Sequence, residues 1–439
     1  MTNNIIKPSI LPGFMELLPS EQILFNKMLD IIRDNYERFG FLPIDTPVIE
    51  KAEVLLAKGG GETEKQIYRF EKGDTDLALR FDLTVPLARY VSQYFSELTF
   101  PFRRYHIGKV YRGEKAQRGR FREFYQCDID IIGNGKLDIV NDAEIPSIIY
   151  STFKDLGFDS FTIKINNRKV LKGFFENLGI SDSTEVLRTI DKLEKIGLNK
   201  VEDELKKQGL DQNTIKEITQ FIQISGTNEE KLQSLEELKI KNDIFQEGLE
   251  ELTAVNHYVK AFGVPEENYI IDLTIARGLD YYTGTVYETF LDDYPNIGSI
   301  CSGGRYDNLA GYYTKQKLPG VGISIGLTRL FYQLTEAKLI KCEDVSLTKV
   351  LIIPMKGCLD QAIEIASGLR EKDINTQIYM ETGKMGKKFG FADKLDIPFT
   401  LVIGEEEIKQ GRYSLRNMET GEQEMLSMEE LITTLGDVK

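Results

Sequence analysis

The chain has 439 residues, enough for two to four domains that each bury a hydrophobic core. It carries 55 basic and 69 acidic residues, and a net charge of −14 argues against non-specific binding of nucleic acid, although local basic patches stay possible. No apolar run approaches the roughly 20 residues that a membrane-spanning helix needs. The N-terminus lacks the charged start and apolar core of a signal peptide.

The first 133 residues predict a helix followed by an antiparallel sheet. Apolar residues recur at helical spacing from Ser20 to Phe39, and Gly40 ends this pattern. An extended run marked by Pro47 follows, with the sequence FLPIDTPVIE. Strand-like segments then dominate from about Ile67 onward, separated by short polar turns, which favours antiparallel pairing.

The remaining sequence predicts a helical insertion and a separate C-terminal domain, so the expected fold class is α+β. Residues 168–262 are helical and highly charged, and strand patterns resume at YIIDLTIA, GTVYETFL and GVGISIG. After Thr348, strand-like and helical segments alternate, as in an α/β domain. The predicted parts are residues 1–166 and 263–340 for the split sheet domain, 167–262 for the insertion and 348–439 for the last domain.

The scattered cysteines and rare histidines favour neither a metal site nor histidine catalysis. The four cysteines form no CxxC pair, and the chain has only two histidines, so a zinc site is not expected. The same cysteine usage predicts a reducing, cytoplasmic location. His106 falls in an expected strand and His257 in an expected helix. Structural or surface roles are favoured for both.

A basic hairpin carries the most information about function. Eight Lys or Arg residues accompany a single acid between Phe102 and Arg122, which is how an otherwise acidic protein builds a site for a phosphate polyanion. Arg112 ends the first expected strand, Glu114 lies two residues on, and Arg120 follows the loop. On composition alone, a solvated edge hairpin accounts for these charges equally well.

Two further segments place polar groups close together. LRFDLTVPLARY contains Asp82 and Thr84, which a strand would aim at one space, but Asp82 could also cap a helix that starts at Thr84. TIARGLDYYTGTVYE contains Arg277, Tyr281 and Tyr282, where a guanidinium can clamp a carboxylate while phenols address a polar side chain. A surface arginine with two core tyrosines is the alternative.

The last two motifs are glycine-rich. SICSGGRYDNL contains Gly303 and Gly304, which permit close backbone approach or form a tight turn. GVGISIGLTRL places Arg329 near the start of a helix, where an arginine is more often solvated.

Together these motifs resemble those of the histidyl-tRNA synthetases, a family of class II aminoacyl-tRNA synthetases. The hairpin is similar to motif 2 of that class, and its tail FYQCDID is similar to the histidyl enzymes. RGLDYYTG and SICSGGRYDNL resemble the two histidyl signatures, while FLPIDTPVIE and GVGISIGLTRL resemble motifs 1 and 3. The resemblance covers almost the whole chain, although over residues 168–262 only position and helicity match the acceptor-stem-binding insertion.

The resemblance implies a role for each motif residue. For ATP, Arg112 would hold the α-phosphate, Glu114 the adenine amino group and Arg120 the γ-phosphate. Phe124 would stack on adenine, and Arg329 would also reach the γ-phosphate. For histidine, Arg112 and Arg277 would bind the carboxylate, and Asp130 would accept a hydrogen bond from the imidazole. The full set implied for histidine is Asp82, Leu83, Thr84, Arg112, Gln126, Asp130, Arg277, Tyr281, Tyr282, Gly303 and Gly304.

The resemblance also implies an activity and its partners. L-histidine and ATP would give histidyl-adenylate and pyrophosphate, and the histidyl group would then pass to the 3′ end of tRNA-His. Mg²⁺ would accompany ATP, held by ligands that the sequence does not identify. Residues 115–119 would meet the tRNA acceptor end, motif 1 would form a homodimer interface, and the last domain would bind the anticodon. No membrane partner is expected.

Two alternative functions share parts of this pattern. The synthetase-like regulatory subunit of ATP phosphoribosyltransferase has the same catalytic fold, but it lacks the anticodon module and commonly loses part of the active site, whereas this chain keeps Arg112, Arg277 and Arg329. An uncharged-tRNA sensing module usually accompanies a kinase domain, and the 439 residues of this chain leave no room for one. The chain departs from the family pattern at Ser302, where Gly is frequent, and at Asp82 and Asp130, where many bacterial members have Glu.

Overall fold

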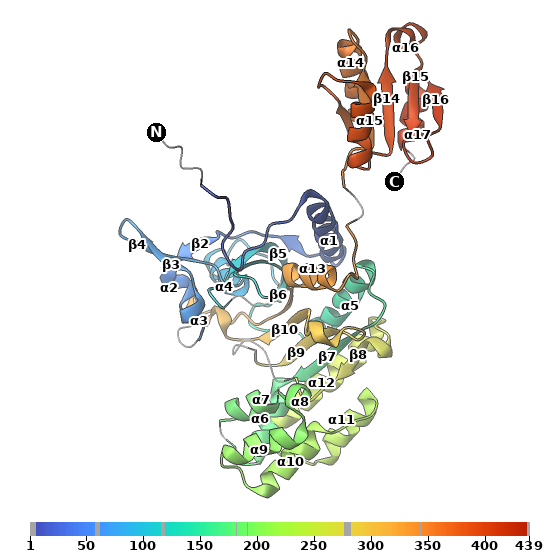
Figure 1. Cartoon of the computed structure of the whole chain (residues 1–439). Helices are drawn as coiled ribbons and strands as arrows, with labels where there is room; N and C mark the ends of the chain where they lie inside the picture. Colours follow the sequence, from blue (N-terminus) through green and yellow to red (C-terminus); the bar gives the residue numbers. More distant parts are fainter. Residues whose placement is uncertain are drawn as a thin grey trace. The chain divides into compact units, whose positions relative to one another are not determined.

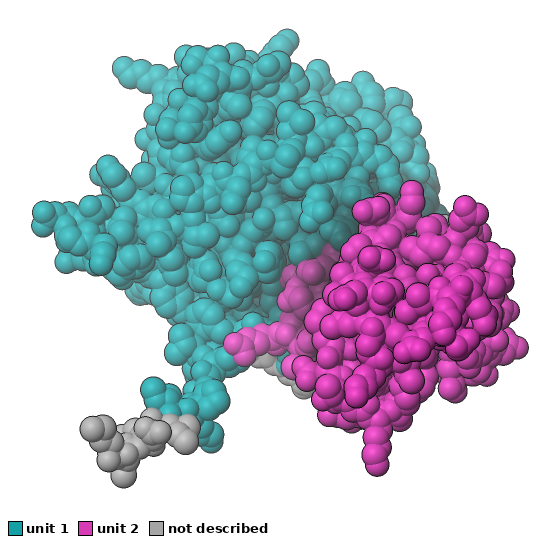
Figure 2. Space-filling model, turned by 90° about the horizontal axis from the view of Figure 1, so that it is seen from above, with its two compact units in different colours: residues 1–15, 28–339 teal, residues 16–27, 340–439 magenta. Residues whose placement is uncertain are grey.

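The computed structural model describes residues 6–57, 62–115, 119–180, 182–190, 192–275, 282–342 and 345–436. The chain forms two compact units, coloured separately in Figure 2. Unit 1 comprises residues 1–15 and 28–339, and unit 2 comprises residues 16–27 and 340–439. Among the helices of the described ranges, none has the length and apolar character needed to cross a membrane.

An eight-stranded sheet organises unit 1 (Figure 1). Neighbours from β5 to β7 pair antiparallel, while the pairs at the two ends, β1 with β5 and β7 with β8, are parallel. The predicted antiparallel sheet is therefore confirmed. In spatial order the strands are β1 (Leu42–Pro43), β5 (Phe102–Tyr111), β6 (Glu123–Ile132), β11 (Gly320–Ile325), β10 (Cys301–Tyr306), β9 (Thr285–Leu291), β7 (Phe161–Asn167) and β8 (Tyr269–Ile271).

A second, three-stranded sheet precedes the basic hairpin. Its order is β2 (Ile49–Lys51), β4 (Thr75–Leu79), β3 (Arg69–Lys72), and both pairings are antiparallel. The sequence predicted strands in this region, but they form this small sheet instead of extending the large one. The nearby helices are α2 (Ala52–Leu55), α3 (Glu62–Gln66) and α4 (Thr84–Gln93).

The helix predicted near the N-terminus is α1 (Pro19–Arg38). Two further helices accompany the large sheet, α5 (Val140–Asp155) and α13 (Leu327–Glu336). Short 3₁₀ turns are η1 (Glu266–Asn268), η2 (Pro295–Ile297) and η3 (Leu309–Tyr312).

The charged region between β7 and β8 is helical, as predicted (Figure 1). Because β7 and β8 are neighbouring parallel strands, these helices form the crossover that joins them. Glycines let α6 and α12 approach closely, since a Cβ at Gly173 would lie 2.4 Å from the backbone nitrogen of Phe245. The helices are α6 (Arg168–Asn177), α7 (Thr184–Ile190), α8 (Leu193–Ile196), α9 (Leu198–Lys207), α10 (Gln212–Ile222), α11 (Asn228–Glu237) and α12 (Asp243–Ala261).

Unit 2 contains a five-stranded sheet of mixed direction. Strands β13 (Thr376–Ile378), β12 (Val350–Pro354) and β14 (Phe399–Ile403) run parallel, as the alternating pattern predicts. The antiparallel strands β15 (Tyr413–Asn417) and β16 (Gln423–Leu426), which the sequence did not predict, complete it. Its helices are α14 (Leu359–Arg370), α15 (Met385–Lys394), α16 (Glu405–Gln410) and α17 (Met428–Gly436).

A buried ion pair joins α5 to the large sheet. Arg305 of β10 donates from Nη2 to Asp142 Oδ1 at 2.7 Å and from Nε to Asp142 Oδ2 at 3.0 Å. Asp142 is fully buried, and its backbone carbonyl accepts a hydrogen bond from the Tyr287 hydroxyl. Because both charges lie away from water, removal of one partner leaves the other uncompensated.

We therefore expect Asp142→Asn to lower the free energy of unfolding by about 3 kcal/mol or more. The charged guanidinium of Arg305 would remain buried beside a neutral amide. Urea unfolding of the full chain, followed by circular dichroism, measures this loss.

Asp30→Asn is the matched control, because the Asp30–Arg33 pair has side chains 58% and 43% exposed. An exposed pair of this kind contributes at most about 1 kcal/mol. Equal losses in the two variants would contradict a stabilising role for the buried pair.

Candidate active site

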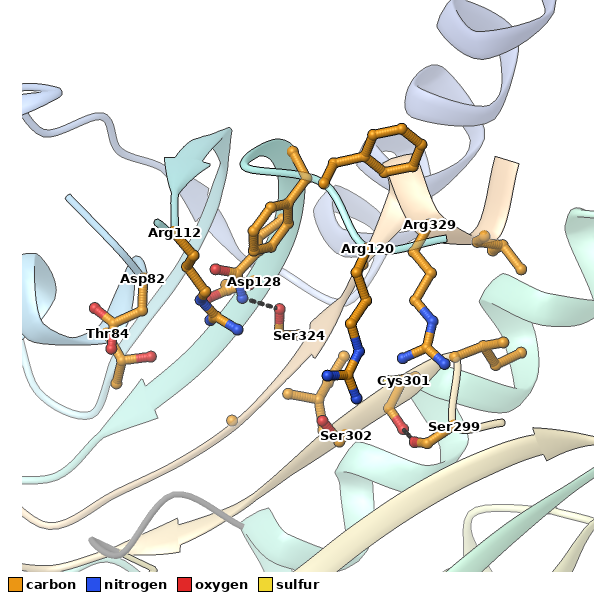
Figure 3. Close-up of a pocket in the computed structure, with 18 of the residues that line it drawn as sticks. Asp82, Thr84, Arg112, Arg120, Asp128, Ser299, Cys301, Ser302, Ser324 and Arg329 are labelled. Carbon is orange, nitrogen blue, oxygen red and sulfur yellow. Dashed lines mark hydrogen bonds between the residues drawn. The ribbon is translucent and has the colours of Figure 1, made fainter. Parts of the chain in front are cut away.

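A cavity of about 440 Å³ opens on one face of the large sheet (Figure 3). Its walls come from the basic hairpin, which includes β6, and from β10, β11 and α13. The structure thus brings together motif residues that lie far apart in the sequence. Those that line the cavity are Asp82, Thr84, Arg112, Glu114, Arg120, Phe124, Gln126, Asp130, Tyr282 and Arg329.

Other predicted site residues lie outside the cavity wall or outside the described residues. Leu83 is completely buried in the core. Arg277 and Tyr281, and most of the loop predicted to meet tRNA, belong to the ranges that the structure does not describe. Gly303 and Gly304 lie within β10 and are not among the described residues that line the cavity.

The two glycines of β10 act through the neighbours that they leave room for. A Cβ on Gly304 would come within 3.0 Å of the Tyr282 ring, which does line the cavity. A Cβ on Gly303 would lie 2.6 Å from the Cα of Ile323 on β11, so this glycine permits close strand packing.

Strand β6 supplies one wall of the cavity. Alternate residues of a strand point to the same face, so Phe124, Gln126, Asp128 and Asp130 are aligned, and all four line the cavity. Asp128 was not predicted as a site residue, although the period-two spacing from Gln126 and Asp130 contains the signal that could have identified it.

The adjoining strand β11 makes room for these acids. Gly322 stands opposite Asp130, and Ser324 stands opposite Asp128. A Cβ on Gly322 would lie only 2.3 Å from Asp130 Oδ1, so no larger residue fits here.

One half of the cavity is cationic. Arg120 and Arg329 lie side by side in Figure 3, and burial, followed by the charge of Arg120, lowers the pKa of Arg329. Arg329 donates to the Ile297 carbonyl at 2.8 Å, but its buried Nε has no hydrogen-bond partner among the described residues. Glu114 is the nearby acid, with its carboxylate 3.7 Å from Arg120. Two close guanidinium groups favour an anionic ligand.

Arg112 lies beside Asp82 and Asp128, while Arg120 and Arg329 lie further along the cavity (Figure 3). Its Nε donates to the Phe81 carbonyl at 3.0 Å, and its guanidinium carbon lies 5.0 Å from the centroid of the Phe124 ring. The carbonyl and the cation–π contact together hold the side chain at the cavity wall.

The other half of the cavity is acidic and is built around a buried cation. Arg104 is completely buried and forms an ion pair with Asp130, whose Oδ1 also accepts a hydrogen bond from the Tyr306 hydroxyl at 2.6 Å. Burial raises the pKa of Asp82 to about 6 and that of Asp128 to about 7, while the charge of Arg104 opposes both shifts. A ligand that brings N–H donors suits this half.

Asp82 and Thr84 reach the cavity from the start of α4 and not from a strand. Asp82 Oδ1 accepts a hydrogen bond from the Val85 backbone nitrogen at 3.1 Å, so Asp82 caps the first turn while it lines the cavity. The helix-cap alternative is therefore correct, and both side chains still line one cavity.

His106 is completely buried, which agrees with the structural one of the two roles, structural or surface, that the sequence favoured. Its Nε2 lies 2.9 Å from Asp45 and 3.3 Å from Arg80. Burial, with the charges of Arg104 and Arg80, lowers the pKa of His106 to about 3, so its ring is neutral at physiological pH.

The hairpin β5–β6 and the segment β11–α13 converge on one cavity in an antiparallel sheet, which defines a class II aminoacyl-tRNA synthetase fold. Residues 13–330 match the family described as histidyl-tRNA synthetase, and residues 349–437 match an anticodon binding domain. This chain belongs to the histidyl-tRNA synthetase family.

Similar proteins cover almost the full length. A histidine–tRNA ligase from Clostridium tetani is 66% identical over 98% of this chain and 99% of its own. The crystal structure of histidyl-tRNA synthetase from Nostoc sp. PCC 7120 is 41% identical, with a TM-score of 0.91 over 98% of this chain and 99% of that chain. A Bacillus halodurans structure titled an ATP phosphoribosyltransferase regulatory subunit/histidyl-tRNA synthetase shares 21% identity and a TM-score of 0.72 over 88% of this chain and 97% of that chain, which shows a common fold alone.

The raised pKa of Asp82 predicts a pH effect on stability. The carboxyl is protonated more readily in the folded state (pKa about 6) than in the unfolded state (pKa about 3.9), so its contribution is complete at low pH and is lost as the pH rises through about 6. Between pH 5 and pH 8, the unfolding free energy of the unliganded protein should therefore fall by about 1 kcal/mol more than that of Asp82→Asn.

Urea unfolding of both proteins at these two pH values measures the difference. Parallel pH profiles would show that Asp82 ionises in the folded protein as it does in water.

Proposed function

We propose that this chain charges tRNA-His with histidine in two steps at the cavity of unit 1. In the first step, a carboxylate oxygen of histidine attacks the α-phosphorus of ATP, and pyrophosphate leaves. In the second step, a hydroxyl of the terminal tRNA ribose attacks the acyl carbonyl, and AMP leaves. The observation that carries this proposal is the division of one cavity into an arginine half and a carboxylate half.

The arginine half fits the triphosphate of ATP. Arg120 and Arg329 take the γ-phosphate, because their adjacent positive charges need an anion. Arg112, held by the Phe81 carbonyl, takes the α-phosphate and stabilises the charge that develops during attack. Phe124 offers an aromatic ring for adenine, and Glu114 an acceptor for its amino group.

The carboxylate half fits the amino acid. Asp82, Thr84 and Gln126 take the α-ammonium group, and Asp130 and Tyr282 address the imidazole. The carboxylate of histidine lies toward Arg112, with Arg277 and Tyr281 completing the site as the family resemblance implies. This arrangement orients the nucleophilic oxygen toward the α-phosphate.

Mg²⁺ accompanies ATP in this proposal. Among the described residues there is no group of three or more His, Cys, Asp or Glu side chains that could hold a metal. A cation held mainly by phosphate oxygens needs only one or two carboxylates from the protein. The bound ion would neutralise phosphate charge.

The remaining partners follow from the domains. Residues 349–437 would read the anticodon, and the hairpin loop at residues 115–119 would meet the acceptor end. A homodimer through the motif 1 segment is supported by the exposed side chains of Leu42 and Ile49. All four cysteines are free thiols, which supports a cytoplasmic location.

ATP–pyrophosphate exchange with each of the twenty amino acids tests the proposed function. We expect exchange with histidine, and a loss of roughly 100-fold or more in Arg112→Ala, because transition-state charge loses its donor. Exchange with another amino acid would refute the substrate. Histidine binding without any exchange would instead favour a regulatory role.

Asp130→Asn tests the histidine half separately. The substitution removes the negative charge that faces Arg104 and the imidazole, so histidine binding should weaken roughly 10-fold or more. ATP binding should hardly change, because the phosphate-binding arginines lie in the other half. Isothermal titration calorimetry measures both constants, and equal losses for the two ligands would contradict the assignment of Asp130.

A further inference from the structure

Two buried acceptor atoms on the cavity face of β6 have no hydrogen-bond partner among the described residues. They are Asp128 Oδ1 and Gln126 Oε1, on side chains that are 2% and 9% exposed. An unsatisfied buried acceptor destabilises the folded protein, and a charged one does so more strongly. Two such atoms at the wall of a cavity indicate a ligand that donates hydrogen bonds.

Ser324 is the cross-strand neighbour of Asp128 on β11. Its hydroxyl opposes the rise in the pKa of Asp128 that burial causes, and it accepts a hydrogen bond from Gln126 Nε2 at 2.7 Å. Ser324 therefore lies between Gln126 and Asp128, and Asp128 Oδ1 has no hydrogen-bond partner among the described residues.

Asp130 is engaged in a different way. Its Oδ1 receives the Tyr306 hydroxyl, and its Oδ2 contacts Arg104. Of the two aspartates at this end of the cavity, Asp128 therefore has the oxygen that lacks a hydrogen-bond donor among the described residues.

The spacing along β6 indicates which substrate group would reach Asp128. Residues two apart on a strand face are roughly 7 Å from each other. If the α-ammonium group binds at Asp82 and Gln126, the side chain of histidine extends by one such repeat, to Asp128, before it reaches Asp130. Three carboxylates lie close together here, and Arg104 is the described cation that acts on Asp128, so an N–H donor is the matching chemistry.

We propose that Asp128 accepts a hydrogen bond from an imidazole N–H of the substrate and is a specificity-determining residue for histidine. This inference rests on the proposed function, since it assumes that histidine occupies the carboxylate half. Asp130 is then a further polar group beside the imidazole ring, and its own position is set by Arg104 and Tyr306.

The test compares histidine with its two N-methyl isomers, each of which has one ring nitrogen blocked. Calorimetry gives the dissociation constants for wild type and Asp128→Ala. We expect Asp128→Ala to weaken histidine binding roughly 10-fold or more and to leave ATP binding unchanged. The preference for histidine over one isomer should also fall by roughly 10-fold, because the variant removes the acceptor and opens space for the methyl group.

Asp30→Asn serves as the control, because it alters an exposed acid of unit 1 outside the cavity and should leave the preference for histidine over each isomer unchanged. If Asp128→Ala folds poorly, Asp128→Asn takes its place, because it keeps the side-chain volume. We expect its loss of histidine affinity to be smaller than that of Asp128→Ala but still measurable. Weaker histidine binding with both preferences intact would show that Asp128 acts on another group, and unchanged binding would also overturn the inference. A wild-type protein that binds no histidine would instead refute the proposed function.

Discussion

The acidic half of the cavity depends on one interaction, the attraction of the buried Arg104 guanidinium to the aspartates around it. Three aspartates approach one another there, and each would be costly to bury as an isolated charge. Arg104 pairs with Asp130, and its positive charge opposes the rise in pKa of Asp82 and Asp128. Arg112 adds a second positive charge near Asp82, and the gathering of three acids at this end of the cavity favours a ligand with N–H donors.

Small residues shape the cavity as much as functional ones do. Gly322 leaves room for the Asp130 carboxylate, and Gly304 leaves room for the Tyr282 ring. Gly304 lies on β10 and Gly322 on β11, and these two strands pair directly with each other. The floor of a ligand site in a sheet is open only where side chains are short, so the glycines matter through the space that they provide.

The fold alone does not decide between a synthetase and a regulatory relative. A structure titled with both names shares this fold at 21% identity. The distinction comes from the site and from the second domain, because function resides in particular groups and not in the architecture. Here Arg112, Arg120 and Arg329 meet at one cavity, and residues 349–437 match an anticodon binding domain.

Features encoded by neighbouring residues were predictable from the sequence. The helix α1, the hairpin β5–β6 and the alternating elements of β12 to β14 follow from local periodicity. The clustered charges of the hairpin were the basis for predicting an anion site there. Asp128 and Arg104 escaped prediction because their importance depends on which strands pair and in which register. For Asp82 and Thr84 the sequence left open a strand or a helix cap, and the structure puts them at the start of α4, where the Asp82 carboxylate accepts a hydrogen bond from the Val85 backbone nitrogen. Tertiary structure alone decided that distant arginines and acids share one cavity, because the sheet order β5-β6-β11-β10 joins segments that the sequence separates by nearly 200 residues.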